Sequence, residues 1–213
     1  MKTLGAVVLC GGKSRRMGRS KVGLPFGDEV LLQRVVRCVR VVASEVVVVA
    51  AIAQELPTLP DDVVILRDAY PDRGPLEGLA VGLEALASRV SHAFVTTTDA
   101  PFLAAAVIRE LFERCDGEAA IPFTGGRAYP LTAIYATALA VRARSLLEHG
   151  ERKVLTLAGT SMHFVSGETL QASPDVTAED PRLASLVNLN TPEDYEAAVA
   201  ELAAMAHGCT ATH

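Results

Sequence analysis

The stretch LGAVVLCGGKSRRMGRSK, residues 4–21, decides the fold and points to a site. Its start, Leu4–Leu9, is a short apolar run that stops near a Gly-Gly pair, which predicts a buried strand followed by a loop. At the carboxyl edge of a parallel sheet, such a loop lies where open α/β proteins bind ligands. Gly11 and Gly12 leave backbone N–H groups free to face a polyphosphate. The loop carries five cations and no acid: Lys13, Arg15, Arg16, Arg19 and Lys21.

Two well-known phosphate loops do not describe this stretch. Gly12-Lys13-Ser14 resembles the end of a P-loop, but the first glycine that a P-loop requires falls at Val7. The G-x-G-x-x-G dinucleotide pattern is absent. A solvated basic loop is the plain alternative, and the coincidence of Gly-Gly, five cations and a buried strand argues against it.

Apolar strand patterns alternate with helix patterns along the chain, which predicts a mostly parallel sheet covered on both faces. We expect one domain over residues 1–206, a flexible tail over 207–213 and a mobile loop over Gln171–Asp180. Strands are expected at Leu4–Leu9, Glu45–Ala51, Val63–Arg67, His92–Thr97, Ala119–Phe123, Leu131–Tyr135 and Met162–Ser166, and helices at Leu31–Val41, Leu76–Ser88, Ala104–Arg114, Ala138–Glu148, Lys153–Ala158 and Pro192–Ala206.

Composition narrows the class of ligand. The 213 residues have a formal net charge of −5, so nucleic acid is not the expected partner, and local positive charge instead favours a small anion. The four cysteines show no C-x-x-C spacing, which favours neither zinc nor a redox pair and fits a reducing cytosol. The apolar run at 46–53 is far below the roughly 20 residues of a membrane helix. We therefore expect a cytoplasmic protein without membrane contact.

Two aspartates follow predicted strands and should lie at the ligand edge of the sheet. Asp99 comes directly after His92–Thr98, with Pro101 stopping the strand, and a carboxylate there can hold the Mg²⁺ that accompanies a nucleoside triphosphate. Asp68 follows the strand that starts at Val63. The plain alternatives are that Asp99 caps the next helix and that Asp68 is a turn residue.

The segment L-C-G-G-K-S-R-R-M-G-R-S-K, residues 9–21, resembles the signature loop of nucleotidyltransferases that modify molybdopterin, the MobA family of molybdenum cofactor guanylyltransferases. The resemblance continues in the family's order over nearly the whole chain. The matching blocks are Gly74-Pro75-Leu76-Glu77-Gly78, Thr98-Asp99-Ala100-Pro101, Arg127 to Leu131, Gly150-Glu151-Arg152-Lys153-Val154 and Asn188-Leu189-Asn190-Thr191-Pro192.

The resemblance implies a single-domain, three-layer α/β/α Rossmann-like fold of the nucleotide-diphospho-sugar transferase type. It implies Mg²⁺-dependent transfer of GMP from GTP to the phosphate of molybdopterin, with release of pyrophosphate. Asp99 would bind the metal, and Arg16 and Lys21 would join it in catalysis. Transient contact with molybdoenzymes or other cofactor-biosynthesis proteins is also expected. The implied nucleotide-binding residues are Leu9, Cys10, Gly11, Gly12, Ser14, Arg15, Lys21, Asp68, Gly74, Pro75, Leu76, Gly78 and Asp99.

The resemblance places the pterin acceptor on the second half of the chain, where Arg127, Arg152 and Lys153 are candidate phosphate-binding cations. Each of them can also be an ordinary solvated charge. Asn188 and Asn190 flank Leu189 and would point to one face of a strand, supporting the metal or the acceptor. The plain alternative is a polar strand end before a helix capped by Thr191.

The chain departs from the family after its second strand, where many guanylyltransferases carry asparagines near the base. Residues 46–53 read VVVVAAIA, so no side-chain amide is expected there to read guanine. A sibling that transfers CMP stays open, although Asn-x-Asn and Gly-Gly favour the guanylyl branch. Two further classes stay open as well: a sugar-1-phosphate nucleotidyltransferase, and a binding module that carries the cofactor without turnover.

Overall fold

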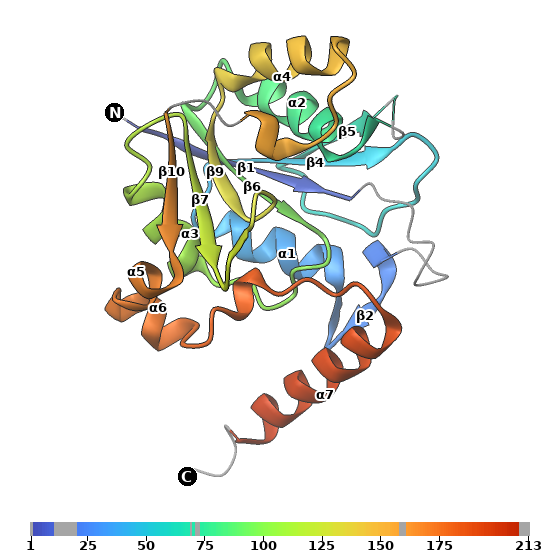
Figure 1. Ribbon diagram of the computed structural model, residues 1–213. Helices are drawn as coiled ribbons and strands as arrows, with labels where there is room; N and C mark the ends of the chain where they lie inside the picture. The colour runs from blue at the N-terminus through green and yellow to red at the C-terminus, as the bar shows by residue number, and fades with distance from the viewer. Residues whose placement is uncertain (1, 11–20, 69, 71–72, 158–160, 209–213) are drawn as a thin grey trace.

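The computed structural model describes residues 2–10, 21–68, 70, 73–157 and 161–208. One large sheet runs through them in the order β10-β7-β9-β6-β1-β4-β5, with β8 paired to β7 (Figure 1). Its strands are β1 (Leu4–Leu9), β4 (Glu45–Ala51), β5 (Val63–Asp68), β6 (His92–Thr97), β7 (Ala119–Thr124), β8 (Arg127–Ala128), β9 (Ala133–Ala136) and β10 (Met162–Ser166).

The sheet is mostly parallel. β1 pairs in parallel with β4 and β6, β4 with β5, and β7 with β10, whereas β9 runs antiparallel between β6 and β7. Two antiparallel pairings in series restore the direction, so the carboxyl ends of β6, β7 and β10 lie at one edge with those of β1, β4 and β5. This edge holds the candidate site.

Helices cover both faces of the sheet in three layers (Figure 1). α2 (Pro75–Leu86) and α4 (Leu139–Glu148) cover one face, above an apolar cluster that includes Val7, Val47 and Tyr135. α1 (Leu31–Arg40) and α3 (Ala105–Glu113) cover the other face, where the cluster includes Val8, Phe94 and Ile108. Adjacent residues of β1 face opposite clusters, which explains why its whole sequence is apolar. The three-layer α/β prediction is confirmed.

α2 packs closely on β1 because two of its residues are glycines. A Cβ at Gly82 would lie 2.4 Å from a methyl carbon of Val7, and one at Gly78 would lie 3.1 Å from Leu9. Since real Cβ atoms avoid separations under 3.0 Å, α2 could not sit at this depth with alanine at position 82. The close approach fixes the start of α2 beside the end of β1.

Several boundaries and connections differ from the sequence expectation. The expected mobile loop over Gln171–Asp180 is wrong: α5 (Gly167–Gln171) ends there and α6 (Pro174–Glu179) occupies most of it. Pro174 pre-sets the first helical turn, and Val176 is fully buried, which outweighs the polar composition. α7 (Pro192–Gly208) extends beyond residue 206, so positions 207 and 208 of the expected tail are helical.

Three short strands were not expected from the sequence. β2 (Pro25–Phe26) and β3 (Glu29–Val30) form a separate two-stranded hairpin, and β8 pairs antiparallel with the end of β7. Each has two residues, too few to show a period-two pattern. The expected helix over Lys153–Ala158 is a 3₁₀ turn, Val154–Leu157.

Candidate active site

The carboxyl ends of β1 and β6 meet at the centre of the ligand edge. Leu9 of β1 is in register with Thr97 of β6, so the residues after them leave the sheet side by side. The Thr98 N–H donates to the Leu9 carbonyl at 3.2 Å, and the Thr98 hydroxyl contacts the Cys10 sulfur at 3.3 Å. These contacts join Cys10, the last described residue before the basic segment, to Thr98, which links β6 to Asp99.

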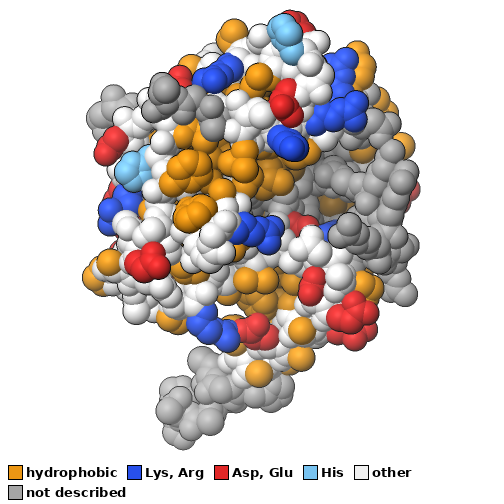
Figure 2. Space-filling model, viewed as in Figure 1, with side chains coloured by type: hydrophobic (Ala, Val, Ile, Leu, Met, Phe, Trp, Pro, Cys, Tyr) orange, Lys and Arg blue, Asp and Glu red, His pale blue; other side chains and the backbone are white. Residues whose placement is uncertain are grey.

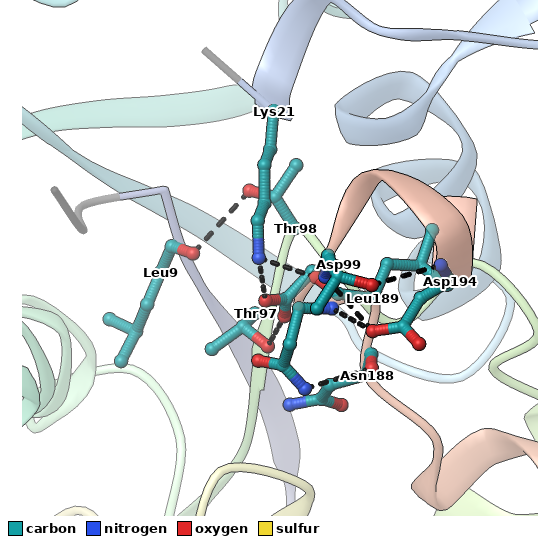
Figure 3. A network of polar contacts seen from close by, with 10 residues as sticks. Leu9, Lys21, Thr97, Thr98, Asp99, Asn188, Leu189 and Asp194 are labelled. Atoms are coloured by element: carbon teal, nitrogen blue, oxygen red, sulfur yellow. Dashed lines mark hydrogen bonds and ion pairs between the residues drawn. The ribbon is translucent and has the colours of Figure 1, made fainter. Parts of the chain in front are cut away.

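Lys21 and Asp99 form an ion pair at this edge (Figure 3). The Lys21 Nζ lies 2.8 Å from the Asp99 Oδ2, and each side chain is 17% exposed. The Thr97 hydroxyl donates to the other carboxylate oxygen at 2.5 Å, and the Lys21 ammonium also donates to the carbonyl of Leu189. The carboxylate is therefore oriented by a neighbouring hydroxyl and is still reachable from solvent.

Residues 187–190, which precede α7, lie beside this ion pair. The Leu189 N–H donates to the Asp99 carbonyl at 2.9 Å, and the Asn190 amide donates to the Asn188 carbonyl at 3.0 Å. The expected strand at Asn188 and Asn190 is wrong, since residues 187–190 have no regular structure, although Leu189 is buried between them. The structure brings both asparagines next to Asp99, and the Asn188 Oδ1 is buried without a hydrogen-bond partner.

The first turn of α7 is closed by a reciprocal cap. The Thr191 hydroxyl accepts from the Asp194 N–H at 3.1 Å, and the Asp194 carboxylate accepts from the Thr191 and Asn190 N–H groups at 2.9 and 2.8 Å. These backbone donors hold the pKa of Asp194 below its usual value. The expected Thr191 N-cap is confirmed, and the bond from the Asn190 N–H to Asp194 fixes the backbone of Asn190 beside the site.

The residues expected to bind phosphate fall mostly outside the described part of the chain. Cys10 and Lys21 bound this gap, and both lie at the ligand edge. Burial raises the pKa of the Cys10 thiol to about 12, so it stays protonated and is no nucleophile. The candidates that lie outside the described residues are Gly11, Gly12, Ser14, Arg15 and Arg16.

Asp68 is the last residue of β5 and is 7% exposed. Its Oδ1 accepts the Tyr70 N–H at 2.7 Å, a bond typical of an ordinary turn residue. Burial raises the pKa of Asp68 above its usual value, the Tyr70 N–H partly offsets this, and the carboxylate of Glu77 adds to it. The buried Asp68 carboxylate can therefore accept hydrogen bonds from a ligand that carries N–H or O–H groups.

The Gly74-Pro75 turn starts α2 near this carboxylate. Gly74 has φ +76°, a conformation suited to glycine, and a Cβ there would lie 3.3 Å from Arg152. Pro75 takes the first helical position, and Leu76 behind it is fully buried. The turn therefore places Gly74, an expected nucleotide-binding residue, next to Arg152, an expected acceptor-binding residue.

The remaining acceptor candidates lie apart. Arg127, in the β7–β8 hairpin, is exposed, and its guanidinium carbon lies 5.2 Å from the Tyr129 ring centroid. Lys153 is exposed before the 3₁₀ turn. Hydrophobic side chains gather over β7, β9 and β10 with Lys and Arg side chains beside them (Figure 2). Phe123 and Phe164 belong to these strands, are 40% and 50% exposed, and have ring centroids 6.1 Å apart.

Sequence reasoning missed two side chains that support the site, Thr97 and Gln54, and a third, Glu77, that joins α2 to α4. Thr97 orients Asp99, and the only signal for it was a run of three threonines after an apolar strand. Gln54 supplies an amide beside the end of β1, three residues beyond the strand in which no amide was found. Glu77, at 2% exposure, bonds Arg144 of α4 and lies 3.6 Å from the Arg73 guanidinium.

The oxygen donors at this edge fit a magnesium ion. The Asp99 carboxylate and the unpartnered Asn188 Oδ1 are hard ligands of the kind that Mg²⁺ takes when phosphates and waters complete its shell. Among the residues that the structure describes, no group of three His, Cys, Asp or Glu side chains could hold a metal by itself. No helix among them is long and apolar enough to cross a membrane.

A basic, Gly-Gly-containing sequence directly after β1 and a carboxylate directly after β6, on one mostly parallel sheet, are typical of a nucleotidyltransferase. The fold matches that of Molybdopterin-guanine dinucleotide biosynthesis protein A from Archaeoglobus fulgidus, with a TM-score of 0.73, 23% identity, and coverage of 93% of this chain and 98% of that one. It also matches 2-C-methyl-D-erythritol 4-phosphate cytidylyltransferase from Thermus thermophilus, with a TM-score of 0.65, 20% identity and coverage of 95% and 99%.

The chain belongs to the MobA-like NTP transferase family, whose domain model matches residues 6–163. A protein of Mycobacterium tuberculosis named "Probable molybdenum cofactor guanylyltransferase" is 42% identical over 164 residues, which are 74% of this chain and 80% of that protein. A Mycobacterium marinum protein of the same name is 37% identical over 203 residues, 92% of this chain and 94% of its own length. The recognition of the family from the sequence is confirmed.

Proposed function

We propose that this protein is a molybdenum cofactor guanylyltransferase, which transfers GMP from GTP to the phosphate of molybdopterin. The observation that carries the proposal is the Lys21–Asp99 pair, held by Thr97 and the Leu189 carbonyl beside the end of β1. A cation and a carboxylate at this edge suit a triphosphate that arrives with a metal. The names of the mycobacterial relatives favour GTP and molybdopterin as substrates.

The reaction forms a bond between an acceptor phosphate oxygen and the α-phosphorus of GTP. The bond from that phosphorus to the oxygen bridging it to the β-phosphate breaks, and pyrophosphate leaves with the electron pair. Since the attacking phosphate is already ionised, no side chain has to remove a proton. Positioning and charge neutralisation then account for catalysis, which fits a site whose one described thiol is protonated.

Each residue of the described site has a part in this scheme. Lys21 leaves Asp99 and the Leu189 carbonyl to neutralise the triphosphate, with the N–H groups of Gly11 and Gly12 and the Arg16 guanidinium as further donors. Asp99, oriented by Thr97, would hold Mg²⁺, and the buried, unpartnered Asn188 Oδ1 is proposed as a further oxygen ligand. The ion, when bound, supplies positive charge that stabilises the charge developing on the phosphates.

The acceptor is proposed to bind along the same edge, toward β7 and β10. The Cβ and main-chain carbonyl of Arg152 adjoin the Gly74 turn, and Leu189, which lies between Asn188 and Asn190, bonds Asp99. These three side chains are proposed to contact the acceptor phosphate or the metal. Arg127 and Lys153 are proposed to add charge. The exposed rings of Phe123 and Phe164 offer an apolar surface for a flat pterin. Cytosolic action is proposed because the described cysteines are free thiols.

The test compares thermal stabilisation by GTP, CTP and ATP, each with and without Mg²⁺. A ligand at 100 times its Kd stabilises by about 2.7 kcal/mol, which a melting curve resolves. Stabilisation by GTP that increases with Mg²⁺ is expected, followed by pyrophosphate release once molybdopterin is added. Preference for CTP would instead assign the cytidylyl reaction, and turnover with a sugar 1-phosphate would assign that acceptor. Binding of pterin without pyrophosphate release would assign a carrier.

A further inference from the structure

The side-chain amide of Gln54 lies between the ends of β1 and β4. Its Oε1 accepts the Ala51 N–H at 3.3 Å, and its Nε2 donates to the Cys10 carbonyl at 3.1 Å. Ala51 is the last residue of β4, and Cys10 follows the last residue of β1. One carboxamide thus connects the two neighbouring strand ends at the ligand edge.

These two bonds replace a bond of the sheet. The Cys10 N–H donates to the Val49 carbonyl at 2.8 Å, which is the first of the two bonds that join Cys10 to β4 in a parallel ladder. The second would run from the Ala51 N–H to the Cys10 carbonyl. Both of these groups bond the Gln54 amide instead. The side chain is therefore inserted into the ladder and keeps the two strand ends apart.

The turn that carries Gln54 is held in place by β5. The Gln54 N–H donates to the Ala51 carbonyl at 3.1 Å. Arg67 of β5 donates from one guanidinium nitrogen to the carbonyls of Ala51 and Gln54, at 3.0 and 2.7 Å. Three adjacent strands thus fix the amide, so its position between β1 and β4 is built into the fold.

We propose that Gln54 is a positioning residue that opens the carboxyl end of β1 for the nucleotide. The inference rests on the proposed function. Cys10 is the last described residue before the Gly11-Gly12 pair, so its carbonyl lies where β1 ends at the ligand edge. With the amide inserted, this carbonyl is satisfied without closing the ladder, and the ends of β1 and β4 stay apart at the edge where the nucleotide is proposed to bind.

The first experiment measures steady-state kinetics with GTP for Gln54→Ala and Gln54→Glu. In Gln54→Ala the ladder closes through a direct bond from Ala51 to Cys10, so the melting temperature is retained while KM for GTP rises about tenfold and kcat stays within about twofold. Gln54→Glu keeps the shape but turns a carboxylate oxygen toward the Cys10 carbonyl. It is expected to raise KM at least as much.

Gln33 offers a matched control. Its Oε1 accepts the Val30 N–H three residues earlier, at 3.2 Å, and its Nε2 donates to the Thr58 carbonyl at 2.9 Å, the same pair of bonds in a place that caps α1. Gln33→Ala is expected to lower the melting temperature and to leave KM for GTP unchanged.

Two outcomes overturn the inference. One is a wild-type KM in both Gln54 variants, and the other is a loss of melting temperature in Gln54→Ala with KM unchanged, which marks a merely structural amide. If the wild-type protein binds no GTP, the proposed function fails instead. The crystal structure of Gln54→Ala then decides on the amide: a direct hydrogen bond from the Ala51 nitrogen to the Cys10 oxygen supports the insertion, and continued separation refutes it.

Discussion

Two ion pairs, Lys21 with Asp99 and Arg144 with Glu77, differ in how far their carboxylates are exposed to water. Lys21 and Asp99 are each 17% exposed, 2.8 Å apart. Glu77 is 2% exposed and bonds Arg144, whose guanidinium also binds both oxygens of Glu84, at 2.6 and 2.7 Å. The bonds to Glu84 and Glu77 raise the pKa of Arg144.

Because the two ion pairs differ in exposure, the Lys21–Asp99 pair can exchange its partners for a ligand and the Glu77–Arg144 pair cannot. A ligand that brings phosphate and a cation can give Lys21 and Asp99 new partners, because solvent already touches both side chains. The Glu77 carboxylate is enclosed, and separating it from its arginines would leave a buried charge unpaired. We therefore propose that the first pair takes part in the reaction and that the second joins α2 to α4.

The largest expected effect is that of Asp99→Ala on turnover. Loss of the proposed metal ligand should lower kcat by about a thousandfold, as for other groups that stabilise transition-state charge. Steady-state pyrophosphate release measures it. Asp62→Ala, which removes an exposed carboxylate 2.7 Å from Arg40, is the control and should leave kcat unchanged. Wild-type turnover by Asp99→Ala with Mg²⁺ would end the assignment of this pair to the reaction.

Glu77→Ala should act on stability. Removing the enclosed partner leaves Arg144 with Glu84 alone and opens space under α2, at a cost of about 3 kcal/mol in the free energy of unfolding. Chemical denaturation measures this cost. Glu45→Ala, which breaks a more exposed pair with Arg89, should cost less than about 1 kcal/mol. Equal losses in the two variants would remove the distinction between enclosed and exposed pairs.

Lys21→Ala should weaken binding of the triphosphate more than it slows the chemical step. We expect KM for GTP to rise about thirtyfold, about 2 kcal/mol, with a smaller loss in kcat. Isothermal titration with GTP and Mg²⁺ checks the binding part. Lys2→Ala removes a cation 3.7 Å from Asp116 at the surface and should change neither constant. A fall in kcat alone would make Lys21 a residue of the transition state.

The smallest effect is a pH dependence at Asp68. Because burial raises its pKa in the folded state, the folded protein binds the proton more tightly than the unfolded chain does. Stability contributed by this group therefore decreases as pH rises from its unfolded pKa, about 3.9, through the raised folded value. Asp68→Asn should remove that decrease while weakening GTP binding. An unchanged difference in unfolding free energy between pH 4 and pH 7 would contradict the assignment.

The centre of the sheet could be predicted from the sequence because β1, β4 and β6 are buried on both faces. β1, β4, β6 and β10 have the expected bounds, each an apolar or β-branched run with a clear stop. Asp99 and Asp68 could be placed at strand ends for the same reason. The segment around Pro174 could not, because burial of Val176 depends on partners distant in sequence. The two-residue strands carried no pattern at all.

The positions of Lys21 and Asp99 at one edge of the sheet were predictable from the sequence, whereas the hydrogen bonds that support them were not. Lys21 and Asp99 are 78 positions apart, and the matching loop and strand-end motifs placed both at one edge of the predicted sheet. The hydroxyl of Thr97 and the amide of Gln54 act through backbone geometry. A threonine or a glutamine at these positions carries no signal in the sequence. Their hydrogen bonds become visible only when the positions of the strand ends are known.

The root of α7 gives a way to watch the site. Leu189 bonds Asp99 through its N–H and Lys21 through its carbonyl, and the helix begins three residues later. If GTP draws Lys21 away, as proposed, the segment before the helix loses the hydrogen bond from Lys21 and keeps the one to Asp99. The chain contains no tryptophan, so a single indole at the exposed Val199 would be the sole emitter in its spectral range. Binding of GTP could then be followed as a change in tryptophan fluorescence, and the labile pterin would not be needed.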